Sequence, residues 1–391
     1  MADDERGTRQ QQRLQNALRD RLDDPSSEPG AVLLRSYYGE ICGCNPAALQ
    51  HYLHTHEVPG GPYTSYFAIR DHSVRVPEGA VGVVYESAEW YRLLHDAQIY
   101  LDNMHQPLYH KKPAHQIQIQ TFHGYPFKQM GLSHWKLQGR DVAHVRSYLD
   151  RAADWDYLVS PASYGSEALA REFGFPNTVL EIGYPRNDVL FSDAADKITA
   201  AVRDRLGIRP GQTAVLYGPT FRDTMSKDDK TAAMVDFLDV DQLAEALGDD
   251  FVIMVRGHAF NARLGTRVGS RGTIVDVTDY PDIADLCLAS DAAVLDYSSL
   301  RFDYGLTGKP MIFMVPDLIQ YQTEARGSLW AYEPTAPGPL LGSTDEVIKT
   351  LRDLDRVRSE YATAYADFRR DYLDLDDGHA TERLVAQVFG S

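Results

Sequence analysis

The segment Asp279-Tyr-Pro-Asp-Ile-Ala-Asp-Leu-Cys-Leu-Ala-Ser-Asp-Ala-Ala-Val-Leu-Asp-Tyr-Ser-Ser-Leu-Arg-Phe-Asp303 has the pattern of a helix, a strand and a second helix. Its middle part, Ala292–Leu295, is short and wholly apolar, as a buried parallel strand is. Asp296–Ser299 then supplies N-cap residue types before the second helix. A helix N-terminus at the carboxyl end of a strand offers N–H groups and a favourable dipole to a phosphate. The segment therefore predicts a parallel α/β sheet with a phosphate site.

The composition indicates a folded globular protein with room for two domains. The chain has 391 residues, of which 43% are hydrophobic and 24% are charged. Its net charge of −17 disfavours a nucleic acid as partner. No apolar run predicts a transmembrane helix, and the charged start Met1–Arg6 lacks the apolar core of a signal peptide. Three cysteines form no disulfide or metal pattern, which favours ordinary thiols in a cytoplasmic protein.

Short apolar runs alternate with helical patterns along most of the chain. We expect residues 1–30 to form a polar N-terminal arm. Strands are predicted at Ser65–Arg70, Ala80–Tyr85, Ile117–Phe122, Tyr157–Ser160, Ala214–Tyr217, Phe251–Arg256, Gly272–Asp276 and Pro310–Met314. This alternation predicts an α/β fold of two doubly wound, Rossmann-like domains that face a cleft. The first domain is expected at 31–188, and the second, with the C-terminal helices, at 189–391.

Polar side chains follow the predicted strands of the second domain, at the edge where open α/β sheets bind nucleotides. A diphosphate there needs about two positive charges or a metal ion. The sequence offers hydroxyl and basic groups for it, and we expect these donor-site residues: Thr220, Arg222, Arg256, His258, Ser298, Ser299, Lys309 and Arg326, with the acidic Asp303 beside them. No converging set of histidines or carboxylates is evident, so neither a metal nor a cofactor is expected.

His123 and Gly124 follow a predicted strand of the first domain. A histidine titrates near neutral pH and can take a proton from an attacking hydroxyl group, while a glycine lets backbone approach a ligand. The alternative is an ordinary loop histidine. With His123 as a catalytic candidate, we expect Gly124 and Lys128 on the acceptor side.

Common nucleotide and hydrolase motifs are absent. Thr307-Gly-Lys-Pro310 lacks the spacing of a phosphate-binding P-loop. The chain also has no Gly-x-Gly-x-x-Gly after a strand and no Gly-x-Ser-x-Gly elbow.

Several ordered blocks together resemble the CDP-glycerol glycerophosphotransferase family of teichoic acid primases and polymerases and related capsule polymerases. They are His123-Gly-Tyr-Pro-Phe-Lys-Gln-Met-Gly, Gly183-Tyr-Pro-Arg-Asn-Asp, Pro219-Thr-Phe-Arg-Asp, Arg256-Gly-His, Tyr280-Pro-Asp-Ile-Ala-Asp-Leu, Asp296-Tyr-Ser-Ser-Leu-Arg-Phe-Asp-Tyr and Lys309-Pro-Met-Ile-Phe. The resemblance covers about residues 31–370.

The resemblance implies a glycosyltransferase-B-like fold and transfer of glycerol phosphate from CDP-glycerol to a lipid-linked polyol-phosphate acceptor, with release of CMP. It implies two catalytic histidines, His123 as general base and His258, which lies with Arg256 at the donor phosphates. Ser298, Ser299 and Asp303 would bind the donor, and the Pro-Thr-x-Arg block adds Thr220 and Arg222.

Departures from the family pattern leave alternatives open. Ala259 follows His258 where many members have a proline or an aromatic residue, and the loop Glu40–Cys44 lacks the usual lysine or aspartate-rich character. A CDP-ribitol-type polyol phosphate transferase therefore remains an alternative. So do a nucleotide-sugar glycosyltransferase of the same fold and, outside enzymes, a polymer-binding scaffold.

A lipid-linked acceptor implies a peripheral position at the inner face of the bacterial cell membrane. One candidate docking patch is Phe127, Met130, Leu132 and Trp135 beside Lys128 and Lys136, and another is Lys111 with Lys112. Ordinary core and rim residues are the alternative. The sequence leaves a homo-oligomer open.

Overall fold

The computed structural model describes residues 11–18, 26–220, 226–228, 231–232, 237–257, 267–268, 273–324 and 327–389. The chain forms two compact units. Unit 1 consists of Met1–His123, Gly131–Asp188 and Leu375–Ser391, and unit 2 consists of Gly124–Met130 and Val189–Asp374.

Unit 1 is built on a seven-stranded sheet with the order β3-β2-β1-β4-β5-β6-β7. All its strand pairs are parallel. The strands are β1 (Glu28–Arg35), β2 (Thr64–Ile69), β3 (Ala80–Val84), β4 (Ala97–Asp102), β5 (Ile117–Gln120), β6 (Tyr157–Ser160) and β7 (Leu180–Glu181). The order reverses between β1 and β4, and this topological switch point is where loops of such sheets leave room for ligands.

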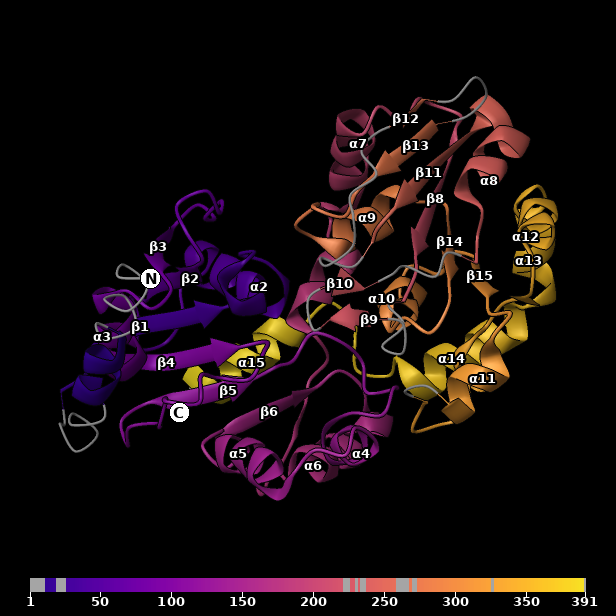
Figure 1. Cartoon of the computed structure of the whole chain (residues 1–391). Coiled ribbons are helices and arrows are strands. Elements are labelled where there is room, and N and C mark those ends of the chain that lie inside the picture. Colours follow the sequence, from indigo (N-terminus) through magenta and orange to yellow (C-terminus); the bar gives the residue numbers. More distant parts are fainter. Residues whose placement is uncertain are drawn as a thin grey trace. The chain divides into compact units, whose positions relative to one another are not determined.

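Helices cover this sheet (Figure 1). They are α2 (Cys44–Thr55), α3 (Ala88–Asp96), α4 (Gly131–Leu137), α5 (Val142–Ala152), α6 (Ser163–Phe173) and α15 (Ala380–Phe389). Residues 11–18, expected within a polar arm, are helical, and Leu18 is only 4% exposed in a core with Trp90 and Leu94. Leu14, one helical turn earlier, packs against the same core, which explains why residues 11–18 pack on unit 1.

The C-terminal segment packs on unit 1, whereas the sequence placed it with the second domain. The carboxylate of Asp188 accepts hydrogen bonds from the backbone N–H groups of Ala380 (2.9 Å) and Thr381 (2.7 Å), and so caps α15. Asp376 accepts one from the Tyr184 N–H at 2.8 Å. Chain order alone does not reveal such a return, because the capping residue lies almost 200 positions earlier in the chain.

Unit 2 is built on a second seven-stranded sheet, with the order β12-β13-β11-β8-β14-β15-β16. Only the β12–β13 pair is antiparallel in it. The strands are β8 (Thr213–Gly218), β11 (Phe251–Val255), β12 (Arg267–Val268), β13 (Thr273–Asp276), β14 (Ala292–Leu295), β15 (Met311–Met314) and β16 (Leu340–Leu341). The order reverses between β8 and β14, which are direct neighbours.

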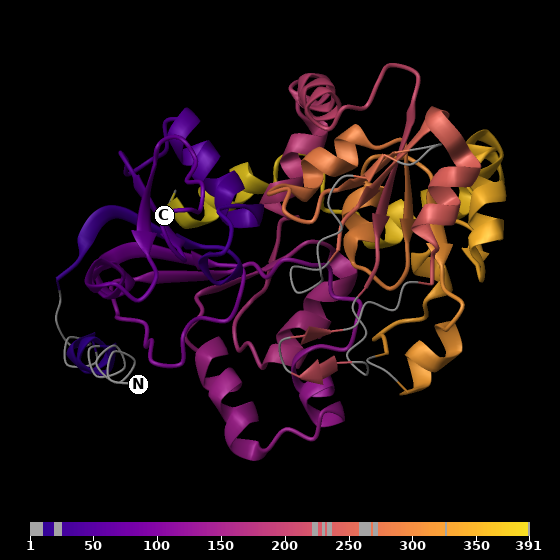
Figure 2. The same cartoon turned by 45° about the horizontal axis from the view of Figure 1, so that its top comes forward.

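Helices flank both faces of the unit 2 sheet (Figure 2). On one face α8 (Val240–Leu247) packs on α12 (Thr344–Leu351), and on the other α7 (Ala195–Arg205) packs on α9 (Ile283–Ala289). Alternate strand residues such as Val215 and Tyr217 form one core with Leu243 and Val347. Further helices are α10 (Leu300–Gly305), α11 (Leu318–Glu324), α13 (Leu354–Glu360) and α14 (Ala362–Tyr372), and a small hairpin pairs β9 (Ser226–Asp228) with β10 (Thr231–Ala232).

Residues 124–130, which we call the crossing segment, belong to unit 2 although the sequence placed them in the first domain. Lys128 forms an isolated antiparallel bridge with Ser328. The Phe127 carbonyl oxygen accepts a hydrogen bond from the Leu329 N–H at 2.8 Å, and the Tyr125 ring stacks on Phe302 with centroids 4.9 Å apart. Backbone pairing and ring stacking, and not position in the chain, thus decide that residues 124–130 belong to unit 2.

Gly131 offers a test of packing in unit 1. It has φ +50°, and a Cβ atom there would lie 2.0 Å from the Glu172 carbonyl oxygen. Gly131→Ala should lower the free energy of unfolding by about 2–4 kcal/mol, from left-handed strain plus overlap. Gly139→Ala is the matched control, since Gly139 has φ +63° and no heavy atom within 4 Å of such a Cβ, so about 1 kcal/mol is expected. Urea denaturation measures both, and equal losses would contradict the packing at Gly131.

Candidate active site

The switch point of unit 2 is organised by Asp296, which directly follows β14. Its carboxylate accepts hydrogen bonds from the Thr220 N–H (3.0 and 2.9 Å), the Thr220 Oγ1–H (2.6 Å) and the Ser298 N–H (3.2 Å). Asp296 is only 6% exposed. It therefore joins the loop after β8 to the turn Asp296–Ser299, which we call the serine turn.

Both serines of this turn are half-buried. The Ser298 Oγ accepts a hydrogen bond from the Leu300 N–H at 3.2 Å, while Ser299, at the N-cap of α10, makes no side-chain cap. The crossing segment passes close by, since a Cβ atom at Gly124 would lie 2.8 Å from the Ser299 Oγ. A glycine at 124 thus permits the approach of backbone to the serine turn.

The Lys128 side chain lies beside Thr220, which Asp296 links to the serine turn. Its Nζ lies 3.5 Å from the Thr220 Oγ1. The structure therefore places Gly124 and Lys128 in unit 2, beside predicted donor-site residues, whereas the sequence placed them in the first domain. The arrangement offers hydroxyl groups and a cation, which together suit an oxyanion.

Arg256 follows β11 and is half-buried. Its Nη1 donates to the carbonyl oxygens of Tyr280 (2.8 Å) and Val277 (3.3 Å), and the Gly257 N–H donates to the Thr278 Oγ1 at 3.0 Å. Arg256 thus holds the loop after β13 at the carboxyl edge of the sheet.

Two predicted donor-site residues lie away from this arrangement. Lys309 precedes β15 and so lies at the amino edge of the sheet, where its Nζ donates to the carbonyl oxygens of Cys287, Leu288 and Ser290 at 2.6–2.9 Å. It caps the C-terminus of α9, and burial lowers its pKa. Asp303 lies inside α10 and is 3% exposed, which leaves little surface for a ligand. Arg222, His258 and Arg326 lie outside the described residues.

His123 lies in the loop after β5 and contacts the switch point of unit 1 through Asn103. The side chain of His123 is exposed, and its Nδ1 lies 2.9 Å from the Asn103 carbonyl oxygen. The fully buried Asn103 follows β4, and its Oδ1 accepts a hydrogen bond from the Tyr37 N–H after β1 at 2.9 Å. The Tyr37 ring lies 5.2 Å from the His123 ring. Residues that follow three strands, β1, β4 and β5, thus hold the His123 imidazole in place.

Side chains from α2 and from the segment before Asp188 hold the backbone around His123. Arg186, which is 5% exposed, donates from Nη1 to the His123 carbonyl oxygen at 2.7 Å. Asn45 donates from Nδ2 to the Phe122 carbonyl oxygen at 3.2 Å, and Phe122 has φ +50°. A left-handed non-glycine residue beside a candidate catalytic group is a strained conformation that the surrounding hydrogen bonds maintain.

Sequence reasoning missed the organising residues Asp296, Arg301, Asn103 and Arg186. An available signal was position, because Asp296 lies directly after β14 and Asn103 lies directly after β4. Arg301 is fully buried behind the serine turn, and only the tertiary structure reveals that.

The structure does not support Phe127, Met130, Leu132 and Trp135 as one docking patch. Phe127 is fully buried in unit 2, and Trp135 is 7% exposed in unit 1, where it packs on Tyr148 with ring centroids 4.5 Å apart. Lys112 pairs with Asp156 at 2.8 Å, and Lys111 lies 3.8 Å from Asp154. The aromatic residues of this first patch therefore belong to the cores of the two units, while Lys111 and Lys112 of the second patch have acidic neighbours.

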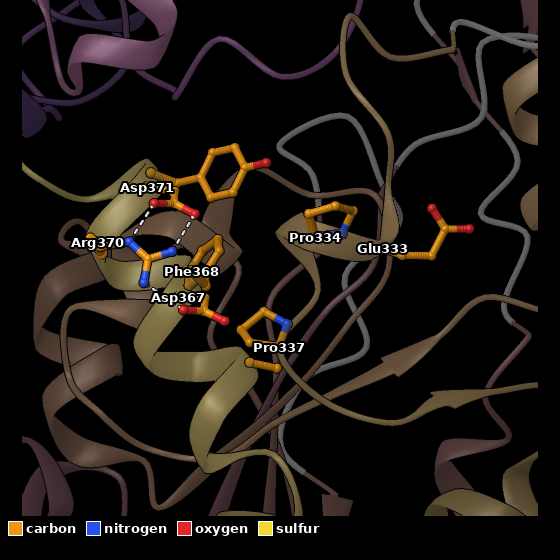
Figure 3. Close-up of a pocket in the computed structure, with 9 residues that line it drawn as sticks. Glu333, Pro334, Pro337, Asp367, Phe368, Arg370 and Asp371 are labelled. Carbon is orange, nitrogen blue, oxygen red and sulfur yellow. Dashed lines mark hydrogen bonds and ion pairs between the residues drawn. The ribbon is translucent and has the colours of Figure 1, made fainter.

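A cavity of about 280 Å³ in unit 2 lies by α14, lined in part by Pro334, Pro337 and Phe368 (Figure 3). Arg370 there donates to Asp367 and Asp371, and Glu333 adds a further negative charge. This acidic cavity disfavours an anionic nucleotide. Among the described residues, no cluster of histidine, cysteine or carboxylate side chains could hold a metal ion. In the same part of the chain, no helix has the length and apolarity needed to cross a bilayer.

The loop that Arg256 holds leads into α9, where Asp285 offers a pH test. Burial, with a smaller contribution from the neighbouring Asp282 carboxylate, raises the pKa of Asp285 to about 6. The folded state thus favours the protonated carboxyl, and the free energy of unfolding should fall as the pH rises from about 4 to about 6. Asp285→Asn should remove this dependence, so that its stability relative to the original protein increases between pH 4 and 6.5 in urea denaturation. A constant difference across that range would contradict the raised pKa.

Two doubly wound, largely parallel sheets, each with polar groups at its switch point, are typical of α/β proteins that bind phosphorylated ligands. The sequence matches, over residues 21–390, the model of the family described as CDP-Glycerol:Poly(glycerophosphate) glycerophosphotransferase. The chain belongs to this family, and the predicted fold class of two α/β domains is confirmed. Glycerophosphate transfer is the activity that defines the family.

Individual relatives support membership of the same family. The chain is 32% identical over 368 residues to the teichoic acid glycerol-phosphate transferase of Staphylococcus aureus (strain NCTC 8325 / PS 47), covering 92% of each. It is 30% identical to the teichoic acid poly(glycerol phosphate) polymerase of Bacillus subtilis (strain 168), covering 92% of this chain but 48% of that protein. A structure of a histidine-to-alanine variant of the wall teichoic acid polymerase TagF has a TM-score of 0.86 at 28% identity, covering 99% of this chain and 97% of the chain in that structure. Another TagF variant, soaked with CDPG, has a TM-score of 0.85.

Proposed function

We propose that the chain transfers glycerol phosphate from CDP-glycerol to a hydroxyl group of a lipid-linked polyol-phosphate acceptor and releases CMP. The observation that carries the chemistry is the contact between the His123 Nδ1 and the Asn103 carbonyl oxygen. Because a carbonyl oxygen only accepts, Nδ1 carries the proton, and the lone pair of the neutral ring lies at Nε2. That is the tautomer of a general base. Family membership and the CDPG soak of TagF support the donor.

In the proposed step, the acceptor oxygen attacks the phosphorus atom that carries glycerol, and His123 Nε2 takes the hydroxyl proton. A new P–O bond forms, the P–O bond to CMP breaks, and the electron pair leaves with CMP. In unit 2, Thr220, Ser298 and Ser299 are proposed to hold the donor diphosphate, with Lys128 and Arg256 stabilising its charge. Arg222, His258 and Arg326 stay predictions for the same role.

The test supplies the purified protein with CDP-glycerol and a short synthetic lipid-linked acceptor, with CDP-ribitol and UDP-N-acetylglucosamine in parallel reactions. We expect CMP release in equal amount to glycerol phosphate added, read by product mass. Release of UDP, or a ribitol phosphate increment in preference to a glycerol phosphate increment, would overturn the proposal and favour one of the alternatives.

We also propose that the chain works at the inner face of the bacterial membrane and docks through the tip of α4 and α5. Leu137, at the end of α4, is 56% exposed, and Val142, at the start of α5, is 84% exposed. Lys136 and Arg140 are exposed beside them, as is Arg146, which lies 3.9 Å from Asp150. Exposed apolar side chains with basic neighbours suit an anionic lipid surface, even on a chain with net charge −17.

Flotation with phosphatidylglycerol-containing vesicles tests this docking tip. The original chain should float with the vesicles, and a Leu137→Ser, Val142→Ser double variant should lose most of that binding. Leu108→Ser is the matched control, because Leu108 is 66% exposed on another loop of unit 1. Flotation of the double variant at the original level would show that the tip is not the docking surface.

A further inference from the structure

Arg301 is a fully buried cation directly behind the serine turn. Its Nε donates to the Ser298 carbonyl oxygen at 3.1 Å, and its Nη2 donates to the Asp296 carbonyl oxygen at 3.1 Å. Its Nη1 donates to the Thr335 Oγ1, also at 3.1 Å. The Tyr332 hydroxyl donates to the same Asp296 carbonyl at 2.7 Å. Two of the four carbonyl oxygens of the turn are thus fixed from the protein interior.

The guanidinium of Arg301 also lies between aromatic rings. It is 4.4 Å from the Tyr332 centroid and 4.6 Å from the Phe127 centroid. Phe127 belongs to the crossing segment, which begins at Gly124 against Ser299. One cation therefore touches both the serine turn and the segment that passes beside it, and such contacts are strongest where water is excluded.

Fixing a carbonyl oxygen also fixes the next N–H group, because the peptide unit is planar and trans. The bond from Arg301 to the Ser298 carbonyl oxygen therefore directs the Ser299 N–H to the opposite side, away from the interior. Likewise the bond to the Asp296 carbonyl oxygen orients the Tyr297 N–H. A phosphate-binding turn depends on such prearranged donors.

We propose that Arg301 is a positioning residue for donor binding, which holds the serine turn and the crossing segment in the arrangement that receives the CDP-glycerol diphosphate. This inference rests on the proposed function. Arg301 acts on the donor indirectly, through Ser298, Ser299 and Phe127.

Calorimetric titration with CDP-glycerol tests the inference, with turnover measured in parallel. Arg301→Met keeps much of the side-chain length but removes the donors and the charge. We expect it to raise the Kd for CDP-glycerol about 10-fold or more, since bonds from a charged donor are lost. Arg301→Lys should give a smaller increase, because an ammonium keeps the charge but not the planar fork.

Arg151→Met is the matched control in unit 1. Arg151 is 7% exposed, donates to the carbonyl oxygens of Gln106 (2.9 Å) and Ser147 (3.1 Å), and lies 4.0 Å from the Tyr148 centroid. Its loss should lower the melting temperature and leave the Kd for CDP-glycerol unchanged. If Arg301 had a purely structural role, Arg301→Met would likewise lower the melting temperature and leave the Kd for CDP-glycerol unchanged.

The outcomes separate this inference from the proposed function. If the original chain binds no CDP-glycerol, the proposed function fails first. If it binds and folded Arg301→Met binds equally well, the inference is overturned. If Arg301→Met does not fold, Tyr332→Phe decides, because it removes the second donor to the Asp296 carbonyl, together with the contact of that hydroxyl group with Arg301, and keeps the ring. An increase of about 3-fold in Kd supports the inference, and an unchanged Kd overturns it.

Discussion

His123→Ala should lower the rate of glycerol phosphate transfer by about 10²- to 10⁴-fold, the usual contribution of a positioned general base. The fold should survive, because the His123 side chain is exposed and exposed truncations usually change stability by less than about 0.5 kcal/mol. The Kd for CDP-glycerol should stay within about 3-fold, since the donor is proposed to bind unit 2. Single-turnover kinetics and calorimetry on the same preparation measure both.

His72→Ala is the matched control for this prediction. His72 is also an exposed histidine of unit 1 but lies in the loop after β2, so its loss should leave transfer unchanged. Near-original turnover of His123→Ala would remove His123 from the mechanism. A loss confined to CDP-glycerol affinity would instead make it a donor ligand.

Asp296→Ala should have the second large effect, on donor affinity and on stability together. The substitution leaves the Thr220 N–H, the Thr220 hydroxyl and the Ser298 N–H without their shared acceptor in a site that is 6% exposed. Hydrogen bonds to a charged group contribute about 1.5–3 kcal/mol each, and water entering the gap recovers part of that. We expect the free energy of unfolding to fall by about 2–4 kcal/mol. The Kd for CDP-glycerol should rise at least about 10-fold.

Asp291→Asn separates these two effects, because Asp291 lies at the other end of the same strand. It accepts hydrogen bonds from the Ala214 N–H (2.7 Å) and Arg203 (3.0 Å) at the amino edge of the sheet. This variant should lose stability and keep its affinity for CDP-glycerol. If Asp296→Ala also kept that affinity, the serine turn would not be the donor site.

Most of the fold could be predicted from local pattern. Ala292–Leu295 is a strand with the predicted bounds, and β11, β13 and β15 differ from their predicted ranges by one residue at one end. Such strands are recognisable because burial on both faces demands continuous apolar residues. The C-terminal pattern, in contrast, divides into α12, α13, α14 and α15, and the last of these packs on unit 1.

The candidate site was predictable where chemistry follows a strand, as at Thr220, Ser298 and His123. Lys309 was assigned by residue type, although a residue before a parallel strand lies at the opposite edge from the donor site. Arg301 appeared to be an ordinary member of the segment after Ser299. Its role depends on Phe127 and Tyr332, which are far from it in the sequence and meet it only through packing.

The sequence by itself determined the α/β class, the strand ends that carry polar groups and the resemblance to one family, because hydrophobic period and residue order are local properties. Only the tertiary structure decided that Gly124–Met130 joins unit 2, that Leu375–Ser391 returns to unit 1, and that Asp296 links two loops. Those outcomes depend on which strands become neighbours and which buried donors find an acceptor. Hydrogen bonds between residues 76 to 193 positions apart carry that information, and no short stretch of sequence contains it.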